Sequence, residues 1–300
     1  MGLRLKTQPQ IDVALRRRIA WHKRRGNRYK PKMPPILHPK QFERSYYRDL
    51  LKSFTKVLEI QKTTLEQALP ALIAQGRLEL QPQRFDDFNA ELSVIIEGIA
   101  VEFGRDLGQD EVKRIASLHG VGVAEFNRKQ NNKVFQRVLG VDVFNSDPWL
   151  ASALENYAAE NAALISTLST KHVNNVRGIV TRGVRQGLAP NAVLAQIRDQ
   201  VGKTKANLRL IARDQVSKLN GQLTELRQTS VGIEKYTWRT SMDERVRGRP
   251  GGRYPGASPS HWAHEGEVFE WAKPPADTGH PGNDFQCRCY AEPILEDLIE

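Results

Sequence analysis

Apolar side chains at helical spacing are the feature that most limits how this chain of 300 residues can fold. From about residue 40 to residue 230 they recur every three or four positions, the pattern of amphipathic helices that bury one face against each other. The clearest stripe is Phe42, Tyr46, Leu50, Phe54, Val57, Leu58, Leu65 and Leu69. The sequence therefore predicts an elongated helical body built from several long helices.

Glycine, proline and threonine mark the expected helix boundaries. Gly187 is a candidate C-cap and Pro190 stands near the next helix start. Two glycines in residues 118–127 predict a kink. Thr204, inside the stretch QVGKTKAN at 200–207, is expected to open the last helix.

The periodicity changes after residue 230. Residues 232–240 are rich in β-branched and aromatic side chains with a partial period of two, which is typical of a strand. Residues 267–271 and 287–293 look like two more strands, separated by loops rich in proline and glycine. The expected fold class is mainly α, with a small C-terminal α+β lobe that holds about three short strands.

Positive charge is concentrated at the N-terminus. Residues 1–34 contain eleven Lys and Arg against Asp12 alone, a net charge of +10 out of +11 for the whole chain. Such an arm suits a polyanion, because each phosphate neutralised releases condensed counterions. It could also be a solvated tail, or a short helix docked on an acidic neighbour. The residues expected to contact nucleic acid are Arg16, Arg17, Arg18, Lys23, Arg24, Arg25, Arg28, Lys30 and Lys32.

These patterns predict three segments. Residues 1–39 form a basic arm and a proline-rich linker, residues 40–203 form the helical body, and residues 204–300 form a C-terminal domain of one helix and the small β lobe. The most apolar window, residues 92–104, carries two glutamates and is too short to cross a bilayer. No membrane partner is therefore expected. The chain is expected to be synthesised in a reducing cytoplasm.

The C-terminal lobe holds the candidate chemistry. Cys287 and Cys289 are the only cysteines, and they stand one residue apart, so both side chains of an extended segment would face the same way. With His261 and one of Asp243 or His264 they could bind zinc, which favours thiolate and imidazole ligands. His280 is a further candidate for the fourth zinc ligand.

Two other interpretations of these residues stay open. The cysteines could be buried apolar thiols, which is the commonest state of free cysteine. Alternatively, Cys289 could be a nucleophile supported by His261 and Asp243. Zinc is the one cofactor that the residues suggest, and none is required.

Three stretches of the lobe resemble the head morphogenesis family typified by protein F of phage Mu. They are YTWRTSMDERVR at 236–247, SHWAHEGEVFEW at 260–271 and PGNDFQCRCYAEP at 281–293. A glycine- and proline-rich insert at 248–257 departs from that pattern. The matching positions are Trp238, Asp243, Arg245, Arg247, His261, Gly266, Phe269, Cys287, Arg288 and Cys289.

The resemblance implies a minor capsid protein of a tailed bacteriophage. Such a protein would be made in the cytoplasm of the bacterial host and lie in the virion, inside the head near the portal vertex. Its expected partners are the portal protein, the major capsid protein, or both, and packaged double-stranded DNA through the basic arm. The alternative is a metal-dependent nuclease or hydrolase using Asp243, His261, Cys287 and Cys289.

Overall fold

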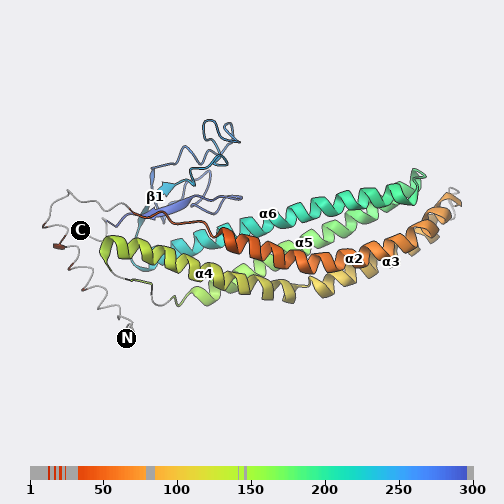
Figure 1. Cartoon of the computed structure of the whole chain (residues 1–300), viewed down its shortest axis with the longest axis horizontal. Helices are drawn as coiled ribbons and strands as arrows, with labels where there is room; N and C mark the ends of the chain where they lie inside the picture. The colour runs from red at the N-terminus through yellow and green to blue at the C-terminus, as the bar shows by residue number, and fades with distance from the viewer. Residues whose placement is uncertain are drawn as a thin grey trace. The chain divides into compact units, whose positions relative to one another are not determined.

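The structure is a computed structural model, and it describes residues 33–78, 85–140, 142–144 and 147–295 (Figure 1). Five isolated positions nearer the N-terminus, Val13, Arg17, Ala20, Trp21 and Arg24, are also described, and all five are helical. The other positions expected to contact nucleic acid lie outside the described residues: Arg16, Arg18, Lys23, Arg25, Arg28, Lys30 and Lys32.

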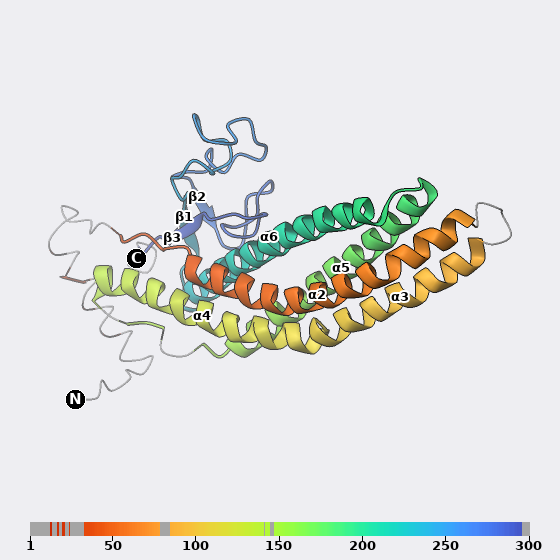
Figure 2. The ribbon, with the colours of Figure 1, turned by 45° about the vertical axis from the view of Figure 1, so that its right-hand side comes forward.

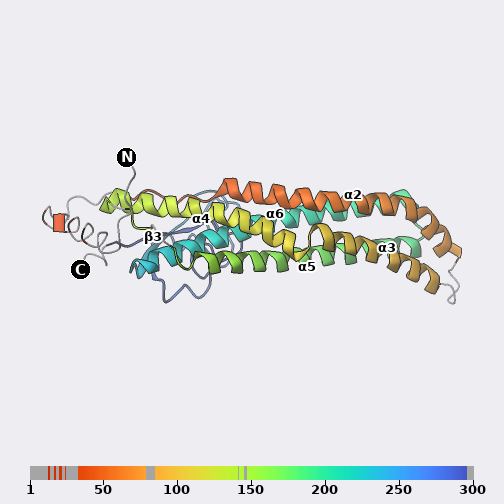
Figure 3. The same cartoon turned by 90° about the horizontal axis from the view of Figure 1, so that it is seen from below.

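Long helices make up most of the described chain (Figure 3). They are α2 (Lys40–Leu78), α3 (Phe85–Asp106), α4 (Gln109–Leu139), α5 (Leu150–Arg185) and α6 (Pro190–Ser230). A sheet of three strands follows, namely β1 (Lys235–Arg239), β2 (Val268–Glu270) and β3 (Tyr290–Pro293). The predicted fold class, mainly helical with a small C-terminal lobe containing strands, is confirmed.

The chain divides into two compact units. One unit contains residues 43–119 and 155–213, and we call it the helical unit. The other contains residues 1–42, 120–154 and 214–300, and we call it the lobe unit.

Apolar stripes form the core of the helical unit, as the sequence predicts. Phe54 of α2 packs edge-on against Phe103 of α3, and both rings lie beside His172 of α5. The buried His172 binds Gln61 Oε1 through Nε2 at 2.9 Å and Thr204 Oγ1 through Nδ1 at 2.9 Å. A buried polar group needs such partners, so this network fixes how α2, α5 and α6 meet.

Helix α6 is longer than the sequence suggests. It begins at Pro190, as expected, but it runs without interruption through Gly202 and Thr204. Thr204 is not a cap, because its hydroxyl donates to the carbonyl of Gln200 one turn earlier, at 3.0 Å, inside the helix. A single helical glycine costs only about 1 kcal/mol, which packing of the buried face offsets.

The helix end before α6 follows the prediction. Gly187 has a φ of +63°, a conformation that is energetically unfavourable for a residue with a side chain. The Leu188 N–H donates to Gly183 O at 2.9 Å and the Gly187 N–H donates to Val184 O at 3.0 Å. This is a Schellman-type end, and it satisfies the last carbonyls of α5.

One glycine of α4 has a packing role. The helix runs unbroken from Gln109 to Leu139. A Cβ on Gly122 would lie 2.4 Å from the Phe42 ring, so the missing side chain admits that ring. Gly122 therefore allows a close approach within the lobe unit, and the predicted kink stays a prediction.

The sheet of the lobe unit is antiparallel with strand order β2-β1-β3 (Figure 2). Tyr236 of β1 pairs with Phe269 of β2, and Trp238 of β1 pairs with Ala291 of β3. Tyr236, Trp238, Trp271, Cys287 and Ala291 form one buried cluster. One of the two cysteines is therefore part of the apolar core of the lobe.

Candidate functional site

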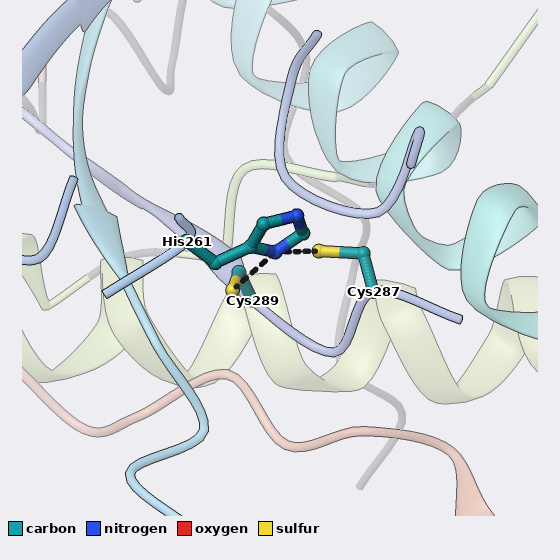
Figure 4. Close-up of side chains that lie close together, drawn as sticks. All are labelled: His261, Cys287 and Cys289. Carbon is teal, nitrogen blue, oxygen red and sulfur yellow. Dashed lines mark hydrogen bonds between the residues drawn. The ribbon is translucent and has the colours of Figure 1, made fainter. Parts of the chain in front are cut away.

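One histidine and both cysteines converge in the lobe (Figure 4). The Nδ1 atom of His261 lies 3.4 Å from Sγ of Cys287 and 3.5 Å from Sγ of Cys289. His261 and Cys287 are buried, and Cys289 is half-buried. We call these three residues the Cys–His cluster.

A carboxylate orients the imidazole of His261 through the ring nitrogen that does not face the cysteines. Nε2 of His261 lies 2.9 Å from Oδ2 of Asp284, and a carboxylate oxygen only accepts, so Nε2 carries a proton. Asp284 is itself held by Arg247, whose Nη1 lies 2.7 Å from the same oxygen. With Nε2 protonated, the neutral ring leaves the Nδ1 lone pair directed at the two sulfur atoms.

Backbone geometry delivers Cys287 to this position. Its N–H donates to the carbonyl of Asp284 at 3.0 Å, and its sulfur accepts from the Gly282 N–H at 3.4 Å. Gly282 has a φ of +99° and passes close to Gly221 of α6, where an added Cβ would lie 2.6 Å from Pro281 O. Glycine at both positions lets the turn that carries Cys287 rest on α6.

The two thiols and the imidazole share protons unequally. The contact with Cys289 holds the pKa of the Cys287 thiol well below its usual range, against the opposing effect of burial, and His261 adds to the lowering. The same contact and burial raise the pKa of Cys289. Burial alone would lower the pKa of His261, but Cys287 and Asp284 more than offset this and raise it. The cluster therefore favours one thiolate beside one protonated thiol.

The other residues considered as ligands lie in different interactions. Asp243 forms an ion pair with Arg288, with Oδ2 and Nη2 2.7 Å apart. His264 contacts Glu267 and Asp277 at 3.3 and 3.2 Å. His280 belongs to a third network: its Nε2 donates to the Trp271 carbonyl at 3.1 Å, and its Nδ1 accepts from the Tyr236 hydroxyl at 2.9 Å.

The remaining residues of the family pattern support the lobe around the cluster. Trp238 is fully buried in β1, and its ring meets the His261 ring at 90° with centroids 5.7 Å apart. Gly266 has a φ of +83° and donates its N–H to the Trp238 carbonyl at 2.9 Å. The Arg245 N–H donates to Asp243 Oδ1 at 2.9 Å, and Phe269 packs near Trp238.

Asp284 is the site residue that sequence reasoning missed. It lies in the stretch PGNDFQCRC, three residues before Cys287, and an acidic residue so near a candidate ligand was the available signal. Its partners come from positions 247 and 261, and sequence spacing does not show that these meet.

The lobe unit is thus a small α+β domain. It combines a three-stranded sheet with a helix, and its loops carry the buried Cys–His cluster. Residues 174–292 match the family model described as Phage Mu protein F like protein. The resemblance seen in the sequence is therefore confirmed over that segment.

A protein of Haemophilus influenzae, described as uncharacterized, is 30% identical to this chain over 269 residues. The match covers 88% of this chain but 56% of the relative, so the chain spans little more than half of the relative's length. No solved structure matches the chain. Among the helices of the described residues, none has the length and apolar character needed to cross a bilayer.

Proposed function

We propose that this chain acts in head morphogenesis of a tailed bacteriophage, as a minor component of the virion. The observation that carries this proposal is the family match over residues 174–292, which includes all of α6, the Cys–His cluster and all of the sheet except its last residue. Other structural proteins of the phage particle are then its partners. Mass spectrometry of purified particles tests this, because a head component remains with the particle after density-gradient purification and a non-structural protein does not.

The proposal also covers location and contacts inside the head. The portal vertex is the expected site, with the portal protein or the major capsid protein as neighbour. Cross-linking of intact particles followed by peptide mapping tests this, because lysines of this chain should link to lysines of one of those two proteins. Links only to tail proteins would contradict it.

Contact with packaged DNA is assigned to the basic arm. The support is its charge, since residues 1–34 carry +10 while the remaining residues together carry +1. Binding of the full chain to double-stranded DNA should weaken steeply with salt, with a slope of about 0.9 per phosphate neutralised on logarithmic axes. Deleting residues 1–34 should remove most of that slope.

A matched set of variants separates charge from sequence. Changing Arg16, Arg17 and Arg18 together to Gln should reduce the slope by up to about 2.7, because three phosphate contacts are lost. Changing the same three residues to Lys keeps the charge and should leave the slope nearly unchanged. If the deleted chain binds DNA as the full chain does, the arm has another partner.

The enzyme alternative gains no specific support. It needs Asp243 to act with the Cys–His cluster, whereas Asp243 is engaged by Arg288 and by the Arg245 N–H.

A further inference from the structure

We propose that the Cys–His cluster is a zinc site, with Nδ1 of His261 and the sulfur atoms of Cys287 and Cys289 as its three protein ligands. This goes beyond the proposed role in head morphogenesis, and it rests on four observations in the lobe unit.

The distances are those of a coordination shell. With Zn–N of about 2.0 Å and Zn–S of about 2.3 Å, a tetrahedral ion separates its nitrogen and sulfur ligands by about 3.5 Å. The two nitrogen–sulfur distances here are 3.4 and 3.5 Å, and all three ligand atoms lie within 4.8 Å of one another. An ion can therefore enter with little movement of the side chains.

The ligand types select the metal. Two thiolates and one imidazole suit zinc, whereas calcium and magnesium take oxygen ligands. The three side chains fill three tetrahedral positions, and the fourth remains for a water molecule.

The surroundings are those that a ligated histidine requires. A metal-bound imidazole usually donates its second ring N–H to a carboxylate, which fixes both its tautomer and its orientation. Asp284 accepts from Nε2 of His261 at 2.9 Å, and Arg247 holds Asp284 in turn. The Gly282 N–H directed at Cys287 Sγ would also stabilise a bound thiolate.

Two other roles for these residues account for less of the geometry. Buried apolar thiols need neither an imidazole between them nor the carboxylate and guanidinium behind it, and burying such polar groups is costly. A disulfide between Cys287 and Cys289 would close a strained ring across one intervening residue, and it would leave Nδ1 of His261 without a role.

The first experiment uses the unmodified full chain. It is purified without chelator, its metal content is measured, and the metal-free protein is then titrated with zinc or cobalt under reducing conditions. We expect one zinc per chain, and cobalt should give the intense absorption of thiolate-to-cobalt charge transfer. Two results would overturn the proposal. In the first, the chain binds no zinc at equimolar concentration although both thiols react freely. In the second, its mass under those conditions is lower by the two hydrogen atoms that a disulfide loses.

Variants then identify the ligands. H261Q and C289S should each lose the ion, whereas H264Q, a change at the neighbouring histidine that contacts Glu267 and Asp277, should keep it. D284N retains all three ligands and should weaken zinc binding about 10–100-fold, the usual effect of removing a partner of a ligated histidine. Cobalt charge transfer that persists unchanged in C289S or in H261Q contradicts the ligand assignment, whatever the stability of the variants.

Discussion

The guanidinium of Arg227 lies 2.6 Å from the carboxylate of Asp147, and both side chains are almost completely buried. Arg227 also donates to Asn127 Oδ1 at 2.5 Å, and its guanidinium carbon lies 5.5 Å from the ring centre of Trp149. Burial lowers the pKa of Arg227, while the bond to Asp147 opposes that effect. Helices α4 and α6 and the segment before α5 are therefore joined inside the lobe unit by one paired charge.

Breaking that pair should cost far more than breaking a surface pair. R227M leaves the Asp147 carboxylate buried and unpaired, and we expect a loss of about 3–5 kcal/mol in the free energy of unfolding. K203M removes a pair with Asp199 in which both side chains are 67% exposed, and it should cost less than about 1 kcal/mol. Urea denaturation of both variants makes the comparison. Equal losses would contradict the role of Arg227, and the double variant R227M/D147L should recover much of the loss.

Two glycines of α6 should respond oppositely to the same change. G221A places a Cβ 2.6 Å from the Pro281 carbonyl and should destabilise the lobe by about 1–3 kcal/mol, because the turn that carries Cys287 must move. G202A meets nothing within 4 Å and should stabilise α6 by up to about 1 kcal/mol. Thermal unfolding of the two variants measures the difference. A neutral G221A would show that the turn does not rest on α6.

The hydroxyl groups of two buried tyrosines should also differ in their contribution to the free energy of unfolding. Tyr236 donates to His280 Nδ1 at 2.9 Å, so Y236F leaves a buried acceptor unpaired and should cost about 1–3 kcal/mol. The buried Tyr157 hydroxyl has no hydrogen-bond partner among the described residues, so Y157F should be neutral or slightly stabilising. Urea denaturation again compares them, and a reversed order would refute the assignment of the two hydroxyls.

Acid should weaken the helical unit through His172. Burial lowers the pKa of His172 to about 4, while an unfolded histidine titrates near 6.5. The unfolded chain therefore takes up a proton first as the pH falls. The free energy of unfolding should decrease from about pH 6.5 down to about pH 4, by up to about 3 kcal/mol from this group.

Denaturation of the parent chain and of H172Q at several pH values tests this. H172Q should lower the free energy of unfolding at neutral pH but flatten its pH dependence between pH 6.5 and 4. An equal dependence in H172Q and the parent would exclude His172 as the source.

Local pattern predicts the elements well, because helices and strands follow from the period of apolar residues. Thr204 and Gly122 show the limit of local pattern. Thr204 is a plausible helix start by its local chemistry, but its hydroxyl bonds to Gln200 inside α6. Gly122 is a plausible kink, but local pattern does not show that the Phe42 ring lies against it. Those partners are set by packing, which spacing along the chain does not reveal.

The candidate site shows the same division. His261 and His264 were both candidate ligands by residue type, but residues 261–266 form turns, and of the two only His261 reaches both cysteines. The pairing of Cys287 with Cys289 could be predicted because one residue separates them. Arg247 was a matching family position, but its contact with Asp284, and that of Asp284 with His261, could not be predicted because these contacts depend on how distant loops close.

The strands of the lobe contain five, three and four residues, which is too little sheet to be stable by itself. The shape of the lobe therefore depends on a few side-chain anchors, and the loops run between these anchors. The glycine- and proline-rich insert at 248–257 lies between two such anchors, Arg247 and His261, which still meet through Asp284. Related domains could thus be better recognised by these contacts than by the distance between them along the chain.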